Sequence, residues 1–459
     1  MLELPPKYRD ACAHIFGSAK RLGGRAYFVG GCVRDALLGK NPKDFDIEVY
    51  GLEPAVLEKM LREKFRVEIV GKSFGVWILK GFDIDVSIPR RERKSGEGHR
   101  AFDIDCDPFL APAEACARRD FTLNAVLYDP LSGEIVDPCG GVADLRAGVL
   151  RHTSERFSED SLRVLRAMQF SARFDMQVAP ETVKLCSEIP FENLPQERVF
   201  EEWRKLILKG VKISRGLCFL RDCGWIKYFP ELAATVGCPQ DPQWHPEGDV
   251  FIHTGLSLDA FATRRTGDER EDLIVGFAVL CHDFGKPLCT TAGEDGKIHS
   301  YAHDILGAAP TRSFLERLTR ERSILEQVPP LVERHMAILD LWRVGAGDSA
   351  IRRLARKVGR IDRLVRVDFA DRNGRGGEPE DDSPQGEWIT ERARELSVRD
   401  SAPKPIVMGR HLVEAGIKPS KKFGEILSRL YEAQLDGEFS DLGGGLELLN
   451  KMLENGGER

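Results

Sequence analysis

The sequence predicts an α+β protein in which a mixed α/β head is followed by helical domains. Between Ala26 and about Val149, apolar runs such as VEIVGKSFGVWILKGFDIDVSI alternate with period two and are interrupted by glycines, which is typical of short strands. From about Ser154 to the end, apolar residues recur at helical spacing. At 459 residues the chain is too long for one hydrophobic core, so three or so domains are expected.

Each element of this arrangement has a local signal. Residues 1 to about 20 are predicted to form a lead-in helix. The stretch 93–108 is rich in glycine and charge and poor in apolar residues, which predicts a mobile loop. In the segment 157–174, leucines and phenylalanines recur near 3.6-residue spacing, so a helix is expected there, with Ser158 as its N-cap.

Two proline-rich breaks divide the helical part of the chain. They lie at Gly237–Asp249 and Arg372–Trp388. Together with the end of the strand-rich region, they predict a head, a neck, a middle domain and a tail. The predicted boundaries are 1–150, 151–236, 237–375 and 376–459.

Composition places the chain among ordinary globular proteins. Hydrophobic residues make up 42% and charged residues 31% of the chain, and no stretch approaches the apolar length of a membrane span. The start MLELPPKYRD does not resemble a signal peptide, and eleven cysteines occur without a CxxC pair, so a cytoplasmic protein with reduced thiols is expected. The net charge of −6 does not exclude RNA, because a local basic groove suffices to bind phosphates.

The segment Tyr27–Val49, YFVGGCVRDALLGKNPKDFDIEV, carries the strongest chemical signal. Asp44 and Asp46 are separated by one residue, so on a strand they would point to the same face. Adjacent carboxylates repel each other unless a cation lies between them, and Mg²⁺ prefers such ligands and leaves room for substrate phosphates. The glycines ahead of them allow the backbone to approach a triphosphate closely. The pattern predicts metal-dependent phosphoryl transfer; the alternative is a turn with two solvated aspartates.

Several ordered motifs resemble one known family. GGCVRDALLG followed by KDFDIEV resembles the nucleotidyltransferase signature of the class II CCA-adding and poly(A) polymerase family. Residues 117–145 resemble its RRD segment, residues 157–174 its EDxxR helix, and residues 405–441 the tail segment of many bacterial members. The resemblance covers roughly the whole chain. It implies a polymerase-beta-type nucleotidyltransferase head followed by helical neck and tail domains.

The resemblance also implies roles for residues of the head. Asp85 matches the third carboxylate, with Asp83 as a rival, and the acidic set would hold two divalent ions that activate the RNA 3′-hydroxyl and steady the departing pyrophosphate. Gly31 and Arg34 match the family's triphosphate contacts. Arg119 would lie by the ribose or the phosphates, where a bidentate guanidinium suits either group.

The EDxxR motif is implied to select the base. Asp160 and Arg163 match the pair that reads the Watson–Crick edges of CTP and ATP, and the i, i+3 spacing predicts that both lie on one helix face. Arginine offers donors and aspartate offers acceptors, which suits cytosine. Arg166 extends the same face toward the nucleotide. A solvated, salt-bridged helix surface is the alternative.

A second chemistry is indicated in the middle of the chain. Six of the ten histidines fall between His245 and His335, and the arrangement H…HD…D resembles the HD metal-dependent phosphohydrolase superfamily. The matching residues are His253, His282, Asp283 and Asp371. Mixed imidazole and carboxylate ligands would bind a divalent metal of unknown identity, which lowers the pKa of a bound water. Helix caps and satisfied core groups are the alternative.

Other residues of this region have open assignments. Asp368 competes with Asp371 as the last ligand, and Lys286 follows the HD pair closely enough to contact a phosphate. His299 and His303 are four residues apart and are candidates for further metal ligands or for contacts to those ligands. The resemblance implies phosphatase and 2′,3′-cyclic phosphodiesterase activities for such a domain.

Two basic segments are candidates for RNA contact. Arginines 352, 356, 360 and 363 recur near four-residue spacing, so one helix face could follow an RNA backbone, although a solvated face is the alternative. Residues 416–424, GIKPSKKFG, form a second basic turn in the part that the family uses near the tRNA elbow.

Taken together, the resemblance implies a CCA-adding tRNA nucleotidyltransferase with an appended HD hydrolase. Its partners would be tRNA, CTP and ATP, with Mg²⁺ as cofactor and no membrane. The same motifs would serve a poly(A) polymerase or an enzyme that adds only CC or only A. A further alternative is an HD phosphohydrolase with a degenerate nucleotide-sensing head, and the oligomeric state is open.

Overall fold

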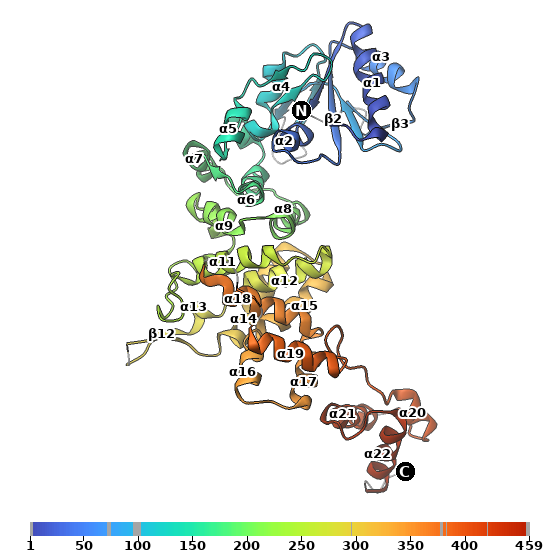
Figure 1. The fold of residues 1–459 in the computed structure, drawn as a ribbon, viewed down its shortest axis with the longest axis vertical. Coiled ribbons are helices and arrows are strands. Elements are labelled where there is room, and N and C mark those ends of the chain that lie inside the picture. The colour runs from blue at the N-terminus through green and yellow to red at the C-terminus, as the bar shows by residue number, and fades with distance from the viewer. Residues whose placement is uncertain are drawn as a thin grey trace. The chain divides into compact units, whose positions relative to one another are not determined.

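The computed structural model describes residues 3–70, 75–94, 102–294, 296–376, 380–381, 383–419 and 421–455. The chain divides into two compact units, Met1–Tyr228 and Phe229–Arg459 (Figure 1). The α+β class predicted from the sequence is confirmed, because the extended sheet lies in the N-terminal head and the rest is helical apart from short ribbons. The predicted domain boundaries at 150, 236 and 375 stay predictions.

The head is built on a seven-stranded sheet with the order β3-β4-β5-β2-β1-β8-β9. Its strands are β1 (Arg25–Val29), β2 (Phe45–Tyr50), β3 (Val67–Val70), β4 (Val76–Leu79), β5 (Ile84–Ser87), β8 (Leu127–Tyr128) and β9 (Ile135–Val136). Its helices are α1 (Pro6–Arg21), α2 (Gly31–Leu37), α3 (Pro54–Arg62), α4 (Pro112–Ala117), η1 (Thr122–Asn124) and α5 (Gly141–Ala147). Helix α1 confirms the predicted lead-in helix.

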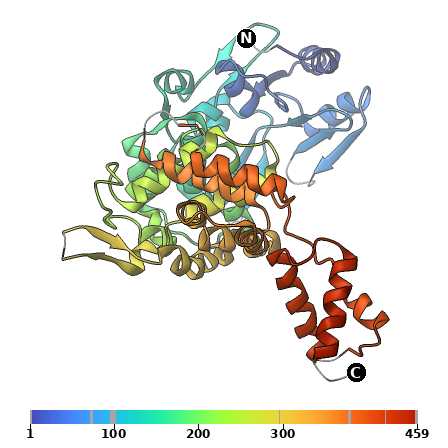
Figure 2. The same ribbon diagram turned by 60° about the horizontal axis from the view of Figure 1, so that its bottom comes forward.

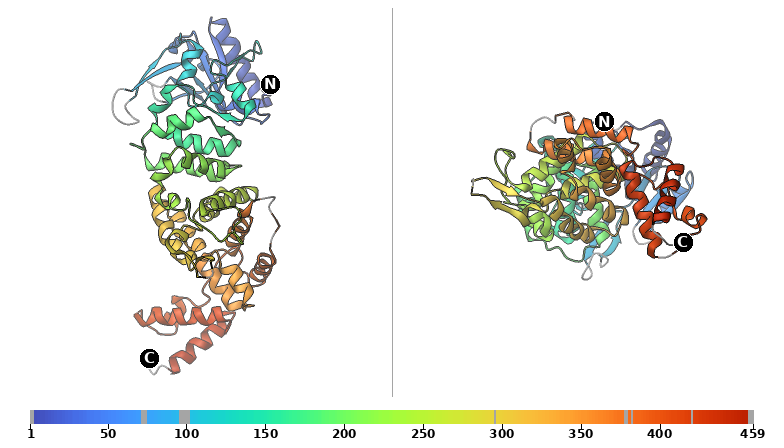
Figure 3. Two further views of the ribbon diagram at one scale, coloured as in Figure 1. Left: turned by 90° about the vertical axis from the view of Figure 1, so that its left-hand side faces the viewer. Right: turned by 90° about the horizontal axis from the view of Figure 1, so that it is seen from below.

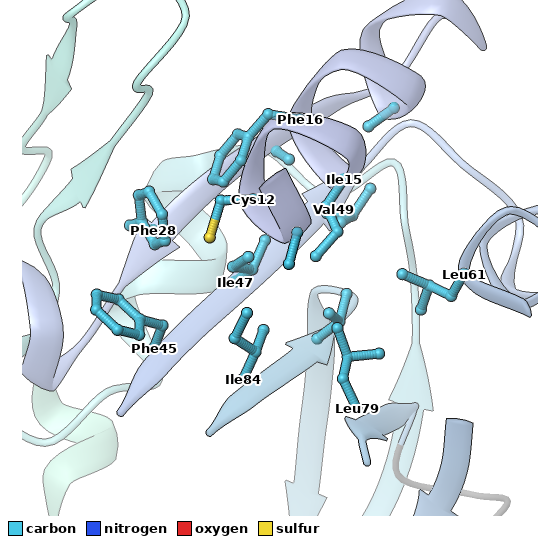
Figure 4. Packing of buried hydrophobic residues seen from close by; sticks show 14 of the residues in the cluster. Cys12, Ile15, Phe16, Phe28, Phe45, Ile47, Val49, Leu61, Leu79 and Ile84 are labelled. Carbon is cyan, nitrogen blue, oxygen red and sulfur yellow. The ribbon is translucent and has the colours of Figure 1, made fainter. Parts of the chain in front are cut away.

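One face of the sheet packs on α1 and forms the main core of the head. Phe28, Phe45 and Ile47 are almost completely buried, and Ile15 and Phe16 of α1 lie over them (Figure 4). Burial of each such side chain contributes roughly 1.5–3 kcal/mol. Because side chains alternate along β2, burial of Phe45 and Ile47 turns Asp46, which lies between them, to the opposite face.

Strand β2 lies between β5 and β1 in the sheet and carries Asp46. It pairs antiparallel with β1 and parallel with β5, and the register places Asp46 beside Asp85. Two residues that are 39 apart in the sequence thus become neighbours on adjacent strands.

The predicted mobile loop at 93–108 is wrong at both of its ends. Strands β6 (Arg90–Lys94) and β7 (Phe102–Cys106) pair as an antiparallel two-stranded ribbon. Glycine and charge content do not report this pairing between two neighbouring segments of the chain. Residues 95–101 of the predicted loop lie outside the described residues.

The neck completes the first unit with helices packed around α6, drawn in green in Figure 3. Its elements are η2 (Glu155–Glu159), α6 (Leu162–Phe174), α7 (Pro180–Glu188), α8 (Gln196–Lys209), α9 (Ile213–Asp222) and η3 (Trp225–Tyr228), with the parallel ribbon β10 (Val149–Leu150) and β11 (Gln177–Val178). Helix α6 starts later than predicted, and Ser158 is not its N-cap, because the Ser158 hydroxyl donates to the carbonyl of Glu155.

The second unit carries a helical core in which α11, α12, α15 and α18 pack together. Its helices are α10 (Pro230–Ala233), α11 (Val250–Thr263), α12 (Glu269–Cys281), α13 (Lys286–Cys289), α14 (His303–Leu318), α15 (Arg322–Glu333), α16 (Ala337–Arg343), α17 (Asp348–Val358), α18 (Ile361–Arg372), η4 (Asn373–Arg375) and α19 (Pro384–Glu395). Strands β12 (Thr290–Ala292) and β13 (Ile298–Ser300) form a hairpin. Asp249 and Asp268 cap α11 and α12 by accepting from backbone N–H groups.

The C-terminal helices α20 (Gly409–Glu414), α21 (Lys421–Asp436) and α22 (Leu442–Asn455) gather around a small apolar core of their own (Figure 2). Leu412, Leu430 and Leu449 are buried within it. Across the described residues, no helix is both long enough and apolar enough to cross a membrane.

Candidate active sites

Three carboxylates meet at the end of β2. Asp44 directly precedes the strand, Asp46 lies on it, and Asp85 is the partner of Asp46 on β5. The surrounding protein desolvates Asp46, although its carboxylate stays open to a cavity, and the pKa rises to about 6 with further contributions from Asp85 and Asp44 against the opposing charge of Arg119. Desolvation and Asp44 also raise the pKa of Asp85. Such a cluster is unfavourable by itself and favourable around a cation.

Asp83, the rival of Asp85, is engaged elsewhere. Its carboxylate accepts a hydrogen bond of 2.6 Å from the Tyr8 hydroxyl and lies 3.7 Å from the ammonium of Lys7. The hydrogen bond from Tyr8 is the main reason that its pKa is lowered. Since Asp85 and not Asp83 stands beside Asp46, the register favours Asp85 as the third member.

A cavity of about 500 Å³ opens next to Asp46. Every residue that the sequence assigned to nucleotide binding lines it, although they come from the head and from the neck. These residues are Gly31, Arg34, Arg119, Asp160, Arg163 and Arg166. Further lining residues that sequence reasoning did not single out are Gly30, Arg90, Arg118, Asp120, Asn124, Leu162, Phe170 and Arg198.

Gly30 shapes the wall of this cavity through its backbone. Its φ of 69° and ψ of −130° belong to a region that residues with a Cβ rarely adopt. A Cβ at this position would lie 3.4 Å from Arg119 Nη1 and 3.5 Å from Asp46 Oδ2. The glycine therefore keeps the space between the carboxylate and the guanidinium open.

A chain of hydrogen bonds joins the head to α6. Arg34 donates to the Asn124 side chain at 2.8 Å, Asn124 donates to Asp120 at 2.9 Å, and Arg166 donates to Asp120 at 2.8 Å. Burial alone would raise the pKa of Asp120, but Arg166 and these hydrogen bonds hold it below its usual value. Arg166 is thus fixed by Asp120, the aspartate of the RRD segment.

Glu48 is the anchor of the neighbouring arginines. It is fully buried and accepts hydrogen bonds from the Tyr50 hydroxyl at 2.7 Å and from Arg118 at 3.0 Å. Its carboxylate also lies 3.5 Å from the guanidinium of Arg119. Burial would raise the pKa of Glu48, but Arg119 and Arg118 lower it overall. Sequence reasoning missed this residue, although the alternation of Asp44, Asp46 and Glu48 could have indicated it.

The base-selecting pair has a geometry different from the prediction. Asp160 has an extended backbone and precedes α6, so the expected i, i+3 pair on one helix face is wrong. Asp160 accepts from the Leu162 N–H at 3.1 Å and from Arg198 of α8 at 2.9 Å. Arg163 donates to the carbonyls of Arg156 and Arg118 at 2.8 and 2.9 Å. Tertiary contacts with the head and with α8 bring the pair to the cavity.

In the second unit, the four predicted metal ligands converge. His253 Nε2 lies 3.0 Å from Asp371 Oδ1 and 3.9 Å from Asp283 Oδ2. His282 Nε2 lies 3.3 Å from Asp283 Oδ2 and 3.7 Å from Asp371 Oδ1. His253, His282 and Asp283 are buried. Their donor atoms lie within 4.8 Å of one another.

Close packing at two glycines makes this convergence possible. A Cβ on Gly374 would lie 2.1 Å from Ser257 Oγ and 2.8 Å from His253 Cε1, so the turn after Asp371 can rest on α11 only without a side chain. A Cβ on Gly285 would lie 1.9 Å from the carbonyl oxygen of His303. Gly285 therefore lets the start of α14 approach the HD pair.

More side chains surround this cluster than the sequence assigned. Glu247 accepts from His253 Nδ1 at 2.7 Å and contacts His245 Nδ1 at 2.9 Å. Burial would lower the pKa of His253, but Asp371 and Glu247 raise it to about 9, so the carboxylates favour positive charge here. The position of Glu247, two residues before the N-cap of α11, carries no sequence signal of this role.

His303 and His335 lie on the other side of Asp283. The Nε2 atoms of the two rings are 3.2 Å apart, and His303 Nε2 lies 3.4 Å from Asp283 Oδ1. Burial, His303 and His282 lower the pKa of His335 to about 4, so its ring is neutral. His299 stacks on Tyr301 instead, with ring centroids 5.2 Å apart. The density of histidines in this window was the one signal that could have indicated His335.

The choice between Asp368 and Asp371 follows from their partners. Asp368 accepts from Arg372 at 3.1 Å, whereas Asp371 faces His253 and His282. Lys286 lies 2.7 Å from Asp283 Oδ2 and donates to Gln240 at 2.6 Å. The geometry thus favours Asp371 as a ligand and places Lys286 at the edge of the cluster.

A cavity of about 430 Å³ opens onto this cluster. Asp283, His303, His335 and Asp371 line it together with the cationic side chains of Lys286, Arg343, Arg372 and Arg375. Four cations around a metal-type donor set suit an anionic substrate such as a phosphate ester.

Most arginines of the predicted basic face at 352–363 form ion pairs with acidic residues of the second unit. Arg356 pairs with Glu432 of α21, and Arg363 donates to Glu271 at 2.6 Å. Arg360 pairs with Asp362 at 2.6 Å. These arginines hold helices of the second unit together, so an RNA-following role of this face loses its support.

Comparisons with known proteins agree with the geometry of the head and neck. A family model described as "Poly A polymerase head domain" matches residues 26–151. A second, described as "Probable RNA and SrmB- binding site of polymerase A", matches residues 175–235. The first covers the sheet with its carboxylates, and the second covers α7 to α9 of the neck.

Relatives that match most of the chain agree with the two family models. A Multifunctional CCA protein of Xanthomonas campestris pv. campestris is 37% identical over 376 residues, covering 79% of this chain and 88% of the relative. A Multifunctional CCA protein of Xylella fastidiosa is 34% identical over 382 residues, covering 80% and 88%.

Solved structures share the fold. The Bacillus stearothermophilus CCA-adding enzyme in complex with CTP matches with a TM-score of 0.67 at 23% identity, covering 98% of this chain and 100% of that chain. The Thermotoga maritima CCA-adding enzyme complexed with tRNA matches with a TM-score of 0.59 at 20% identity, covering 98% and 96%. The chain therefore belongs to the class II CCA-adding family, with the multifunctional CCA proteins as its relatives, and it is a nucleotidyltransferase.

Proposed function

We propose that this protein adds CMP, CMP and AMP in turn to tRNA 3′ ends, using CTP and ATP without a nucleic-acid template. The observation that carries the proposal is the cavity that Asp46 of the carboxylate cluster lines together with Asp160 and Arg163 of the neck. Relatives named Multifunctional CCA protein support the same activity.

The carboxylates fit a divalent metal, and Mg²⁺ is the ion that we assign to them. Asp44, Asp46 and Asp85 offer only oxygen donors, and their mutual repulsion is what a hard cation relieves. When bound, the metal supplies a lowered pKa for the RNA 3′-hydroxyl and neutralises charge on the triphosphate.

The side chains around the carboxylates bind and orient the nucleotide. The open space beside Gly30 and Gly31 admits the triphosphate, and Arg34, Arg119 and Arg166 provide guanidinium donors for its oxygens. Because Asp120 holds Arg166, Glu48 holds Arg119 and Asn124 holds Arg34, little side-chain freedom remains to be lost on binding.

Base selection is assigned to Asp160 and Arg163. The carboxylate of Asp160 accepts from the cytosine or adenine amino group, and Arg163 donates to ring acceptors. Arg198 orients Asp160 from α8 by donating a hydrogen bond to its carboxylate. Hydrogen-bonding side chains of this kind discriminate between bases by about 1–3 kcal/mol for each good pair.

The test uses three tRNA transcripts, which end before C74, at C75 and at A76. Each is incubated with protein and Mg²⁺, with CTP and ATP given separately and together, and products are sized on a sequencing gel. We expect three nucleotides on the shortest transcript, followed by a stop. A stop after CC, action on the C75 end alone, or an unlimited A ladder would each assign a different activity. No extension would overturn the proposal.

A second function is favoured by the buried histidine cluster. We infer that the second unit hydrolyses phosphate esters, including 2′,3′-cyclic phosphates, with a divalent metal held by His253, His282, Asp283 and Asp371. Imidazole and carboxylate donors together fit a borderline transition metal. When bound, that metal supplies a water of lowered pKa. Lys286, Arg343, Arg372 and Arg375 orient the phosphate at the mouth of the cavity.

Replacing both members of the HD pair separates the two functions. The His282→Ala, Asp283→Ala protein is expected to lose hydrolysis of a 2′,3′-cyclic nucleotide and to keep CCA addition, because the carboxylate site lies in the other unit. Hydrolysis that persists in this variant would overturn the assignment.

A further inference from the structure

Three cations gather around one aromatic ring in the first unit. Phe174 is the last residue of α6. The centroid of its ring lies 4.7 Å from Arg34 Cζ, 4.9 Å from Arg173 Cζ and 5.2 Å from Lys40 Nζ. The attraction of one cation to an aromatic ring is weak at an exposed site, and like charges repel one another. The ring alone therefore does not account for this group of cations.

The backbone at the end of α2 fixes the position of Lys40. The N–H of Gly39 donates to the Ala36 carbonyl at 3.1 Å, and the N–H of Lys40 donates to the Asp35 carbonyl at 2.8 Å. Gly39 has a φ of 71°, which this type of helix ending requires and which glycine adopts without strain. The side chain of Lys40 is exposed, but its Cα is held in place.

The charges of Lys40 and Arg173 have no carboxylate partner among the described residues, whereas Arg34 pairs with Asp35 at 2.7 Å. Arg173 is half-buried, and burial together with the charge of Arg34 lowers its pKa. Two uncompensated positive charges thus lie next to a third, and an anion between them would relieve their repulsion.

This group lies next to the nucleotide cavity. Arg34 and Phe170 line that cavity, and Phe170 stacks on Phe174 with ring centroids 5.6 Å apart and planes 14° apart. Of the described residues around the ring, Lys40, Arg173 and Phe174 do not line the cavity. The two unpaired cations therefore stand beyond Arg34 and Phe170, outside the space assigned to the nucleotide.

Asp44 connects this group with the carboxylate cluster. Its negative charge opposes the lowering of the Arg173 pKa, so the two side chains are within electrostatic reach of each other. Asp46 lines the nucleotide cavity, whereas Asp44 is not among its described lining residues. In nucleotidyl transfer the nucleotide and the RNA 3′-hydroxyl must meet at the same metal. With the nucleotide in the cavity, the RNA has to approach from outside it.

We propose that Lys40 and Arg173, held together by Phe174, bind phosphodiester groups in the single-stranded 3′ end of the RNA. The strand carries one negative charge per nucleotide, which supplies the anions that these cations lack. Bound in this way, the terminal 3′-hydroxyl reaches the carboxylates from the side of Asp44. The inference rests on the CCA addition proposed above and assigns residues that hold its RNA substrate.

Two other accounts of the cations make different predictions. The cations could bind the γ-phosphate of the nucleotide instead, or they could only join the ends of α2 and α6. Contact with RNA phosphates makes binding depend on salt, and each contact to a single strand contributes about 0.7 to the slope of log affinity against log salt concentration. Neither of the other accounts changes that slope.

The experiment titrates the full chain with two tRNA transcripts, without nucleotide, over a series of KCl concentrations. One transcript ends at C75, and the other lacks the single-stranded 3′ end. We expect Lys40→Gln and Arg173→Gln each to weaken binding of the first transcript by about tenfold at low salt and to reduce its salt slope by about 0.7. Binding of the second transcript should not change. Lys40→Arg and Arg173→Lys keep the charge and should keep the parent slope.

Matched controls separate a lost contact from a lost charge or a lost fold. Lys59→Gln and Arg62→Gln remove the same charges from exposed positions of α3 and should leave both transcripts unaffected. Circular dichroism reports folding, and the exposed Lys40 decides the question if Arg173→Gln fails to fold.

Steady-state addition gives a second readout. In both glutamine variants the KM for the transcript ending at C75 should rise while the KM for ATP stays at the parent value. A rise in the KM for ATP alone would assign the cations to the triphosphate and overturn the proposal. An unchanged salt slope, or equal weakening of both transcripts, would overturn it as well. A parent protein that binds tRNA but extends no transcript would refute CCA addition instead, because the binding series tests the RNA contact by itself.

Discussion

The two sites of this protein use different donor atoms for related chemistry. In the head, Asp44, Asp46 and Asp85 offer oxygen only, and arginines surround them. In the second unit, imidazole nitrogens outnumber carboxylates in the histidine cluster, and His253, His282, Asp283 and His335 are buried. Oxygen donors suit Mg²⁺ bound together with a triphosphate, whereas mixed donors suit a transition metal that lowers the pKa of water. The donor set thus separates the proposed nucleotide transfer from the proposed ester hydrolysis.

The two sites also differ in how the chain assembles them. The carboxylates lie on neighbouring strands of one sheet, so strand register alone aligns Asp46 with Asp85. The histidines come from α11, the end of α12, the start of α14 and the segment after α15. The second site therefore depends on helix packing, including the close approaches at Gly285 and Gly374.

The sharpest test of this separation is Asp46→Asn. Loss of one carboxylate weakens binding of the metal that stabilises charge in the transition state. The rate of CCA addition should therefore fall by about 10³-fold or more. Hydrolysis of a cyclic nucleotide by the second unit should be unchanged. Asp83→Asn is the control, since Asp83 binds Tyr8 and should tolerate the change. Equal loss in both variants would contradict the assignment of Asp46.

Glu48→Ala tests whether Glu48 holds Arg118 and Arg119 in place next to the carboxylates. It leaves Arg118 and Arg119 as buried charges without their anion, so the head should lose about 3 kcal/mol of stability. Hydrogen exchange of the β1 and β2 amides measures this loss in the head alone. Glu134→Gln is the matched control, because its pair with Arg25 lies at the surface and should contribute less than about 1 kcal/mol. Similar effects of both substitutions would show that Glu48 is not an anchor.

Glu247→Gln tests the corresponding support in the histidine cluster. Glu247 orients His253 through its Nδ1, and loss of such a partner typically costs about 10–100-fold in metal affinity. Titration with Mn²⁺ measures the change, and CCA addition should stay at the parent level. The exposed Glu294→Gln serves as the control. An unchanged affinity would mean that His253 needs no carboxylate to hold its ring.

The smallest expected effect concerns nucleotide choice. Arg163→Ala should reduce discrimination between CTP and the other nucleotides by about 10–100-fold, while the carboxylate chemistry persists. Misincorporation on the shortest tRNA transcript measures it, with the exposed α3 residue Arg62→Ala as the control. Loss of all addition without loss of selectivity would place Arg163 in the triphosphate site instead.

Local sequence patterns predicted much of this geometry. Alternation around Phe45 placed Asp44 and Asp46 together, and the spaced histidines and aspartates indicated the second cluster before any contact was known. The helix containing Arg163 was also expected from apolar spacing. These features depend on residues that are close in sequence, where backbone periodicity is enough.

The failures share one physical cause. Composition suggested a loop at 93–108, where β6 and β7 pair with each other, and the i, i+3 rule placed Asp160 on a helix that starts after it. A solvated or RNA-binding face was expected where Arg356 pairs with Glu432. In each case contacts with another segment of the chain, which composition and local spacing do not report, accompany the outcome.

The sequence by itself therefore determined the fold class, the carboxylate pair, the base-selecting residues and the ligands His253, His282, Asp283 and Asp371 as candidates. Tertiary structure alone decided that Asp85 stands beside Asp46, that Glu48 and Asp120 hold the arginines, and that His335 joins His303 at Asp283. The reason is that periodicity fixes which way a side chain points along its own element. Which atoms it meets depends on register and packing between elements far apart in the chain.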